Sequence, residues 1–477
     1  MYKSSFLTTN ISAPMERVHD HSATPLKIVV GGYSGKIVIV EYDQNRKEFT
    51  GLKTETREST SGKSPSYVGF SPDGRCLYAT NEVSDFRGLN ATGSISSFAI
   101  TADHSLRHIA TALTAADPVA LAVSPDGKHL VVAEYTGGSW SKFTLNDQCG
   151  FQSENADQRV KYHGSGPNTS RQDHSYIHQV VYNHAGDLLF AVDLGGDSVY
   201  VHRVDRKTGD IEEKVVHEIK LPPGSGPRHL SMTGNRAEEY DIYLISELSN
   251  QLFTIRLSDH PHHGIKTTIR QETSTLPAGT AEEMRRTYGA GEVMMSGDGR
   301  FVYGSNRQTD LSKPLSDNSI VVFKRDPHSG RTSKPAWFPL PGPANTPRHF
   351  SFSNDPLQKF FIVGAQQANS LSIFLRNPAT GALRFLANTP LQTPARLLNL
   401  SLSRRRASTK QSPKPARLYT PTCTCAIGPN GGILLSPTAV KNLFNCPEFK
   451  HQKRAILPYK KWRLQRQRRL KDNKNKV

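Results

Sequence analysis

The chain has 477 residues, with 60 Lys and Arg against 42 Asp and Glu, which gives a formal net charge of +18. It contains 36 Gly and 30 Pro and no run of 18 apolar residues, so a membrane-spanning helix is excluded and an all-β chain rich in turns is favoured. Residues 403–477 carry 19 basic side chains against Glu448 and Asp472, while the rest of the chain is nearly neutral. This distribution excludes a basic main body specialised for nucleic-acid binding.

The first 24 residues precede the regular pattern and are expected to form an N-terminal extension. They contain no apolar run of signal-peptide length, so the sequence predicts a soluble, cytoplasmic protein without a membrane anchor. The cysteines agree with that location, because Cys76 and Cys149 lie far apart in the sequence and no disulfide framework is indicated.

Residues 25–402 are expected to form one repeating domain. Six segments share a small residue or proline, an apolar strand, a turn and a second apolar strand. Several turns read SPDG or SGDG, in which glycine permits a tight hairpin. The last apolar residue before each turn recurs every 50 to 63 residues, at Phe70, Val123, Tyr182, Met232, Met295 and Phe352.

A third strand with alternating polarity follows each pair, as in NSIVVFKRD, and a weaker fourth strand fills the gap to the next repeat. Four antiparallel strands per repeat are typical of a β-propeller blade. A WD40 array is excluded because Trp-Asp pairs do not recur and the repeat exceeds the usual length of about 40–45 residues.

A seventh blade is divided between the two ends of the domain. LKIVVGGY and GKIVIVEYD, within residues 26–43, match the second and third strands of the pattern, and no first strand precedes them. TPARLLNLSL, residues 393–402, is the strand available to complete that blade. We therefore expect an all-β, seven-bladed β-propeller closed by N- and C-terminal strands that share one blade, which removes exposed edges.

Residues 403–477 lack the repeat and are expected to form a basic, disordered tail that contacts polyanions non-specifically. Cys423 and Cys425 form a lone CxC without a second pair at zinc spacing, so no metal site is predicted there.

The repeats resemble those of a known family. SPSYVGFSPDGRCLYATNE, GSGPNTSRQDHSYIHQVVYNHAGDLLFAVDLGGDSVYVHR, PGSGPRHLSM, ISELSN and GEVMMSGDGRFVYGSNR look like motifs of the seven-bladed lactonase family, in the same order. That family includes 6-phosphogluconolactonases and carboxy-cis,cis-muconate lactonizing enzymes. The resemblance covers about residues 25–402.

The resemblance implies an active site at one mouth of the central channel, formed by His178, Arg228, Glu247 and Arg307. Tyr176 stands where many lactonases have a first histidine of a His-x-His pair, a feature shared with the lactonizing branch, whereas GSGPN and RQ between Gly164 and Gln172 resemble the lactonase branch. The family lacks the basic tail.

These residue types suit lactone chemistry. Histidine activates water near neutral pH, and arginines bind carboxylate or phosphate and stabilise an oxyanion, so neither a metal nor a cofactor is required. The leading hypothesis is a lactone hydrolase for 6-phosphogluconolactone or a related sugar lactone. The alternatives are a carboxy-cis,cis-muconate lactonizing cycloisomerase, with a small anionic muconate as substrate, and a non-catalytic propeller scaffold; no specific nucleic acid or membrane partner is expected for the propeller.

The other histidines have structural interpretations. A metal site of His174 and His178 needs a helix, but the strand-like HQVVY argues against one. His184 is expected in a hairpin turn, and the loop at residues 259–264 is polar. His229 and His349 occupy equivalent repeat positions, which indicates a structural role, and the adjacent Arg348 is a candidate channel-lining residue.

Overall fold

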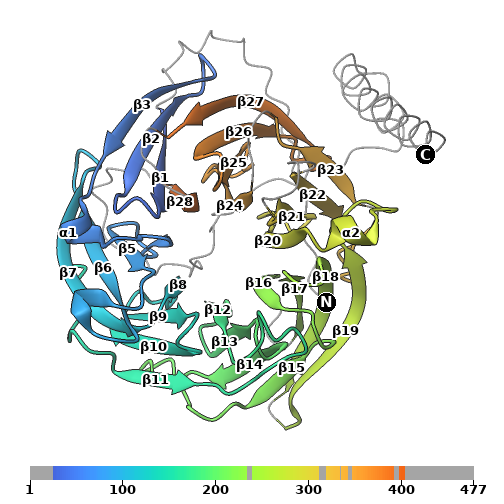
Figure 1. The fold of residues 1–477 in the computed structure, drawn as a ribbon, viewed down its shortest axis with the longest axis horizontal. Helices are drawn as coiled ribbons and strands as arrows, with labels where there is room; N and C mark the ends of the chain where they lie inside the picture. Colours follow the sequence, from blue (N-terminus) through green and yellow to red (C-terminus); the bar gives the residue numbers. More distant parts are fainter. Residues whose placement is uncertain are drawn as a thin grey trace, which may run out of the picture. The chain divides into compact units, whose positions relative to one another are not determined.

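The computed structural model describes residues 25–233, 239–260, 262–310, 318–333, 335–341 and 346–391, together with the backbone of 397–402. These residues form seven four-stranded antiparallel sheets arranged in a ring (Figure 1). The predicted seven-bladed β-propeller is therefore confirmed. The predicted extension over 1–24 and the predicted tail over 403–477 lie outside the described residues.

The strands are numbered along the chain, and each blade takes four of them. Blade 1 contains β4 (Val68–Phe70), β5 (Cys76–Asn81), β6 (Thr92–Ile100) and β7 (Leu106–Ala115). Blade 2 contains β8 (Pro118–Val123), β9 (His129–Glu134), β10 (Ser139–Thr144) and β11 (Gln158–Lys161). Blade 3 contains β12 (Ile177–Tyr182), β13 (Leu188–Asp193), β14 (Ser198–Arg203) and β15 (His217–Lys220).

The second half of the ring repeats this order. Blade 4 contains β16 (Pro227–Met232), β17 (Glu239–Ser246), β18 (Gln251–His260) and β19 (Gly264–Ser274). Blade 5 contains β20 (Tyr288–Met295), β21 (Phe301–Gln308), β22 (Ser319–Lys324) and β23 (Ala336–Pro339). Blade 6 contains β24 (Pro347–Phe352), β25 (Phe360–Ala365), β26 (Ser370–Arg376) and β27 (Leu383–Pro390). Short helices α1 (Glu58–Ser61), η1 (Phe86–Gly88) and α2 (Glu282–Arg285) lie in connecting loops.

Blade 7 joins the two ends of the described chain, as predicted. It contains β28 (Leu397–Leu402), β1 (Leu26–Gly32), β2 (Val38–Asp43) and β3 (Glu48–Thr54), in that order. β28 pairs antiparallel with β1, with Val30 opposite Leu400 and Ile28 opposite Leu402. β28 takes the inner position that β4 or β8 takes in other blades (Figure 1), so the ring has no open edge.

Turn chemistry sets the hairpin between the first two strands of a blade. In blade 2, Ser124 Oγ donates to Asp126 Oδ1 over 2.6 Å, and Asp126 Oδ1 accepts from the Lys128 backbone N–H over 3.1 Å. Gly127 adopts a φ of +77°, which a residue with a side chain rarely tolerates. The predicted SPDG hairpin therefore turns through its own Ser and Asp side chains.

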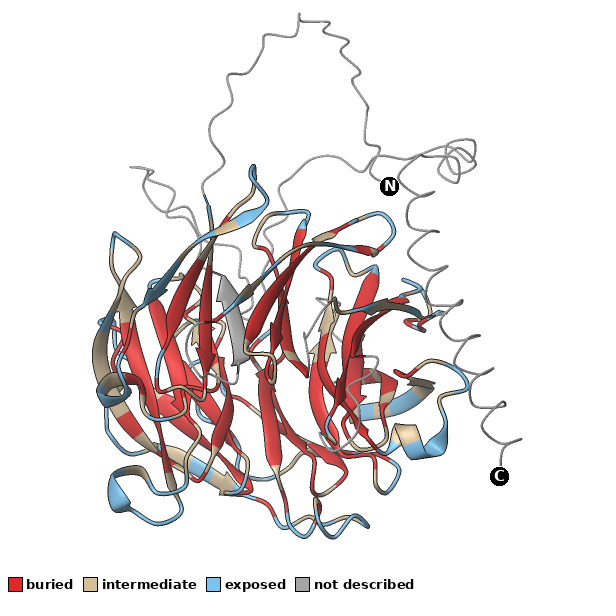
Figure 2. Cartoon of the chain, turned by 45° about the horizontal axis from the view of Figure 1, so that its top comes forward, coloured by how far each residue is buried: buried red, intermediate tan, exposed pale blue. Residues whose placement is uncertain are grey.

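The core lies between neighbouring blades. Every residue of β12 and β13 is buried, because both faces of these inner strands pack against adjacent sheets, whereas the outer strand β3 is mostly exposed. Figure 2 shows the same contrast around the ring, with buried inner strands and more exposed outer strands and loops. Phe190 of blade 3 and Phe253 of blade 4 belong to one apolar cluster. Burial of each such side chain contributes about 1.5–3 kcal/mol.

One sequence prediction is wrong. Cys76 of β5 and Cys149, in the turn after β10, form a disulfide with a Cα–Cα distance of 5.4 Å. They are separated by 73 residues, but neighbouring blades place them side by side. Distance along the sequence was therefore a poor guide, because one propeller repeat returns the chain to the adjacent blade.

Candidate active site in the central channel

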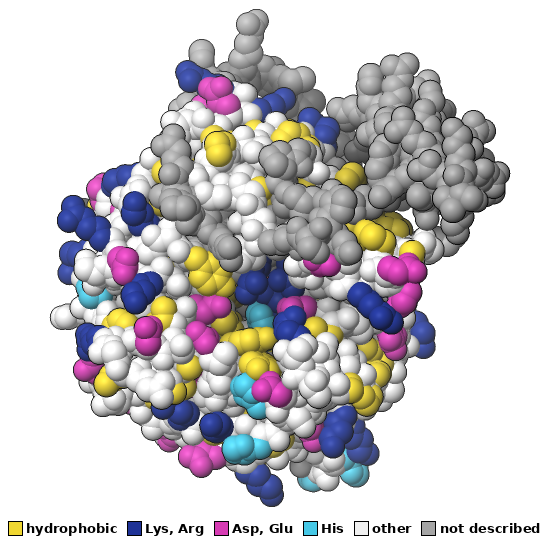
Figure 3. Space-filling model, in the orientation of Figure 1, with side chains coloured by type: hydrophobic (Ala, Val, Ile, Leu, Met, Phe, Trp, Pro, Cys, Tyr) yellow, Lys and Arg dark blue, Asp and Glu magenta, His cyan; other side chains and the backbone are white. Residues whose placement is uncertain are grey.

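The four predicted site residues lie together near the centre of the ring. His178 is in β12, Arg228 in β16 and Arg307 in β21, and Glu247 directly follows β17. Each is at most 6% exposed. Viewed down the ring, basic, acidic and histidine side chains gather at the central hollow (Figure 3). Three consecutive blades thus contribute to one place.

A recurrent irregularity at the start of the inner strands orients several of these side chains. The pairing register of β12 shifts between Ile177 and Gln179, which leaves His178 as an extra residue opposite β13. The same shift leaves Arg228 as the extra residue of β16 and Arg348 as that of β24. A bulge redirects a side chain away from the regular alternation. Equivalent bulges therefore direct different chemical groups towards the channel at the same height in each inner strand.

Glu247 is surrounded by guanidinium groups. Its Oε2 accepts from Arg228 Nε and lies 2.9 Å from a terminal nitrogen of Arg307, and its Oε1 accepts from Arg171 over 2.7 Å. Burial alone would raise the pKa of Glu247, but the charges of Arg307, Arg171 and Arg228 outweigh it and hold the pKa well below its usual range. The carboxylate therefore stays ionised and orients three arginines.

His178 belongs to a buried hydrogen-bond chain. Its Nδ1 lies 3.2 Å from His229 Nε2, and His229 Nδ1 lies 2.7 Å from Glu292 Oε1. Arg228 also donates to His229 Nε2 over 3.2 Å. Burial, followed by the charge of Arg228 and the neighbouring His229, lowers the pKa of His178 well below its usual range, so this imidazole is neutral near pH 7.

His229 and His349 recur at one repeat position because they share a partner. His349 Nδ1 bonds to the second carboxylate oxygen of Glu292, over 2.5 Å. The Val293 backbone N–H donates to Oε1 of the same carboxylate over 3.0 Å. Burial would raise the pKa of Glu292, but its histidine neighbours lower it, so the group is a carboxylate. Blades 4, 5 and 6 are thereby joined through one buried anion.

The opposite side of the channel carries a second polar group. Tyr33, which follows β1, donates to Glu82 over 2.9 Å, and burial raises the pKa of Glu82 against the opposing charge of Arg348. Arg348 Nε is buried and has no hydrogen-bond partner among the described residues. Unpaired buried donors are rare in proteins, so Arg348 is available to a bound anion.

An aromatic group lies beside His178. The Tyr135 ring contacts His178 edge to face, with centroids 5.5 Å apart, and packs against Tyr176 at 4.6 Å. Tyr176 donates its hydroxyl to Asp173 over 2.8 Å, and its ring lies 4.0 Å from that of His174. Tyr176, the departure from the lactonase pattern, thus forms part of an aromatic wall on the loop before β12.

The predicted separation of the histidines agrees with the structure. His174 lies in the loop, His178 in β12 and His184 in the hairpin turn beyond it, so no helix face brings them together. Within the part of the chain that the structure describes, no group of three or more His, Cys, Asp or Glu side chains is arranged to hold a metal ion. No helix in the described segments is long and apolar enough to cross a membrane.

Several channel residues were missed, and repeat position could have identified most of them. Glu292 lies three residues before Met295, the same offset at which His229 and His349 precede their own apolar residues. Tyr33, Glu82 and Tyr135 each follow the second strand of a blade, as Glu247 does. Arg171 comes from an unrepeated loop, so the sequence carried no comparable signal for it.

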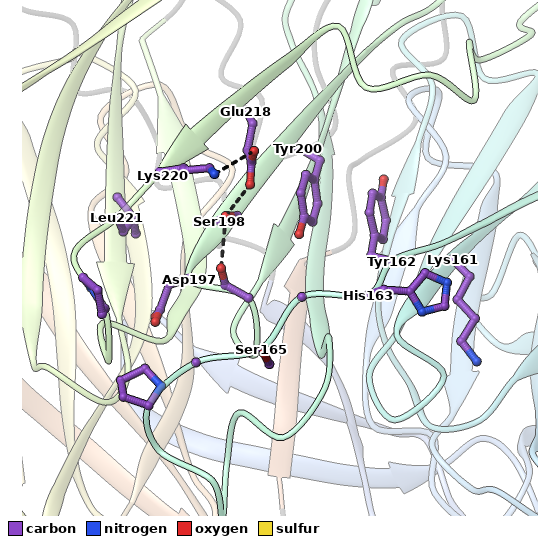
Figure 4. Close-up of a pocket in the computed structure, with 15 residues that line it drawn as sticks. Lys161, Tyr162, His163, Ser165, Asp197, Ser198, Tyr200, Glu218, Lys220 and Leu221 are labelled. Carbon is purple, nitrogen blue, oxygen red and sulfur yellow. Dashed lines mark hydrogen bonds and ion pairs between the residues drawn. The ribbon is translucent and has the colours of Figure 1, made fainter.

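A separate cavity of about 630 Å³ lies between blades 2 and 3 (Figure 4). The stacked rings of Tyr162 and Tyr200, 4.2 Å apart, line it, as do Lys161, Lys220 and Glu218. Glu218 accepts from Ser198 Oγ over 2.8 Å. None of the four predicted site residues lines this cavity, which distinguishes it from the central site.

The fold and the central site agree with comparisons to known proteins. The family described as Lactonase, 7-bladed beta-propeller matches residues 27–398. The chain belongs to this family. The resemblance inferred from the repeat motifs is thereby confirmed.

Several relatives of this chain are bacterial lactonases. A 6-phosphogluconolactonase of Bacillus subtilis is 26% identical over 363 residues, covering 75% of this chain and 92% of the relative. A 6-phosphogluconolactonase of Formosa agariphila is 28% identical over 325 residues, covering 67% and 84%. The structure of a periplasmic gluconolactonase of Pseudomonas aeruginosa matches with a TM-score of 0.66 and 26% identity, covering 80% of this chain and 99% of that one. These similarities support a lactone hydrolase as the class of enzyme.

Proposed function

We propose that the protein hydrolyses 6-phosphogluconolactone or a related sugar lactone at the mouth of the central channel, by acid–base chemistry without a metal ion. One observation carries this proposal: a neutral buried histidine, His178, lies in a cluster of guanidinium groups ordered by one carboxylate. Names of relatives in the same family point to the same substrate class.

In the proposed reaction, His178 accepts a proton from water while the water oxygen bonds to the lactone carbonyl carbon. Arg228 and Arg307 stabilise the negative charge that develops on the carbonyl oxygen, since fixed donors in a buried site need no reorganisation. The bond from that carbon to the ring oxygen then breaks, and the proton on His178 passes to the ring oxygen. Glu247 remains ionised throughout and holds the arginines.

The substrate's anionic group is assigned to the other arginines. Arg348 has an unpaired buried Nε, and Arg171 is 39% exposed with one terminal nitrogen on Glu247. Arginine presents planar paired donors that match a phosphate or carboxylate. A phosphorylated sugar lactone therefore has a partner for its charge separate from the partner for its carbonyl.

The test measures loss of 6-phosphogluconolactone above its spontaneous rate, for the wild type, His178→Gln and a matched control, His184→Gln, at the far turn of the same hairpin. We expect His178→Gln to lower kcat by about 10²–10⁴-fold, the usual contribution of a general base, and His184→Gln to retain activity. A carboxy-cis,cis-muconate is assayed in parallel. Cyclisation of the muconate with no lactone hydrolysis would identify a cycloisomerase. If the wild type and every variant show the same result with both substrates, the non-catalytic scaffold is the remaining hypothesis.

The cytoplasmic location also stays a proposal. Disulfides persist mainly in oxidising compartments, so the Cys76–Cys149 bond is the observation that opposes it. Cell fractionation, with an antibody to the native chain, determines whether the protein lies in the cytoplasm or in an oxidising compartment.

A further inference from the structure

We propose that Glu292 and His229 are positioning residues that hold His178 in the tautomer with its proton on Nδ1, leaving Nε2 as the base. The inference rests on the proposed role of His178 and concerns how that role is established. It assigns a function to two groups that do not contact the reacting atoms.

Glu292 determines the tautomer of His229. An ionised carboxylate only accepts hydrogen bonds, and Oε1 lies 2.7 Å from His229 Nδ1. His229 must therefore carry its proton on Nδ1. His349 and the Val293 backbone N–H bond to the same carboxylate, so three hydrogen-bond partners hold Glu292 in place.

His229 in turn determines the tautomer of His178. With its proton on Nδ1, neutral His229 has only a lone pair at Nε2, and Arg228, which cannot accept, donates to it over 3.2 Å. His178 Nδ1 lies 3.2 Å from the same Nε2. Two lone pairs at that distance repel, so His178 Nδ1 must be the donor.

The opposite arrangement needs a second proton on His229. That would place an imidazolium beside the Arg228 guanidinium in a site where His229 is 4% exposed. Burial lowers the pKa of His229 to about 4, and Arg228 acts in the same direction against Glu292. Near neutral pH, Glu292 therefore determines the tautomer of His229, and His229 determines the tautomer of His178.

The consequence is a lone pair at His178 Nε2. This nitrogen has no hydrogen-bond partner among the described residues, although the side chain is almost wholly buried. In the other tautomer Nε2 would carry a proton and could not activate water. The chain thus sets which nitrogen of His178 acts.

The first experiment needs no substrate. Long-range ¹H–¹⁵N correlation spectra of the full-length protein labelled with ¹⁵N-histidine report which ring nitrogen bears the proton, and His178→Gln assigns the His178 signals by their loss. We expect an Nδ1-protonated His178 in the wild type at pH 7. We expect Glu292→Gln or His229→Leu to increase the Nε2-protonated form.

The second experiment is kinetic. Glu292→Gln and His229→Leu should lower kcat about 10–100-fold with KM within about twofold, as for loss of groups that orient a reacting residue. His229→Gln should restore much of the rate, because its amide can donate to Glu292 and accept from His178. Glu134→Gln is the matched control, since Glu134 is a fully buried carboxylate in blade 2 that binds Ser139, Ser141 and the Ala115 backbone.

An Nε2-protonated His178 in the wild type would overturn the proposed relay, in which Glu292 sets the tautomer of His229 and His229 sets that of His178. So would a folded Glu292→Gln protein whose tautomer and kcat both match the wild type, or a His229→Gln protein no better than His229→Leu. If the wild type hydrolyses no lactone, the proposed function fails, while the tautomer measurement still decides the relay on its own.

Discussion

Arg171 and Glu247 form an ion pair with a nitrogen–oxygen distance of 2.7 Å, although 76 positions separate them in the sequence. The pair links the loop that enters blade 3 to the end of the second strand of blade 4. Arg171 is the most exposed of the three guanidinium groups around this carboxylate. Under the proposed function, Arg171 is therefore placed to meet the substrate before the buried arginines do.

Replacement of Arg171 should weaken substrate binding more than turnover. We expect Arg171→Gln to raise KM about tenfold, the effect of one lost charge-assisted hydrogen bond, and to change kcat less. Steady-state kinetics at two ionic strengths provide the measurement. Arg203→Gln is the control, because Arg203 is similarly exposed and pairs with Asp259 away from the channel; an equal effect from both variants would exclude a specific role for Arg171.

Loss of the Glu247 charge should destabilise the fold. Three guanidinium groups would then face one another without a counter-ion, and breaking a buried ion pair costs about 3–5 kcal/mol. We expect Glu247→Gln to lower Tm clearly and to abolish turnover. Calorimetry at pH 7 measures the first effect, and an unchanged Tm would mean that water or ions replace the carboxylate.

The same group predicts how stability depends on pH. The folded-state pKa of Glu247 is depressed, so its contribution is complete above its unfolded pKa of about 4.3 and is lost as pH falls towards the folded value. The Tm of the wild type should therefore fall steeply as the pH is lowered below about 4.3. Glu247→Gln should show a shallower acid slope, and parallel slopes would contradict the assignment.

Activity should persist at a pH below the ordinary range of histidine. Burial, Arg228 and His229 lower the pKa of His178, with Arg348 acting in the same direction and Glu247 opposing them. The proposed reaction needs His178 as a neutral base, so we expect the acid limb of kcat/KM to lie below pH 6.5. Arg228→Met should move that limb upward, because one positive neighbour is removed; a downward shift would contradict this account.

The Cys76–Cys149 bond should contribute to stability. A cross-link closing a loop of this size stabilises a fold by about 2–4 kcal/mol, so Cys76→Ser or treatment with a reductant should lower Tm. Alkylation followed by mass spectrometry under non-reducing conditions checks the bond itself. Two free thiols in the native protein, with no effect of reductant on Tm, would exclude the cross-link.

The repeat pattern predicted the ring well because a hairpin every 50 to 63 residues leaves few architectures that bury both faces of the inner strands. It also predicted β28, since β1 and β2 needed an inner neighbour. It could not predict the Cys76–Cys149 contact or the Arg171–Glu247 pair. Those depend on how loops of adjacent blades lie beside each other, which periodicity does not encode.

For the site, the family motifs led to four residues that the structure brings together, but their individual roles stay predictions. The repetition of His229 and His349 suggested scaffolding alone. Their common bond to Glu292 has a physical meaning that single positions could not reveal, because hydrogen-bond direction is a property of the whole chain of groups.

The strand β28 has a consequence for how the molecule is made. During synthesis the N-terminal blades emerge first, yet β1 waits for a partner that lies about 370 residues downstream. Tyr33 of blade 7 and Arg348 of blade 6 can come together only once the ring is complete. A chain whose synthesis stops early therefore has an open ring with an unpaired strand edge and an incomplete channel. Only chains translated through Leu402 can form the complete site.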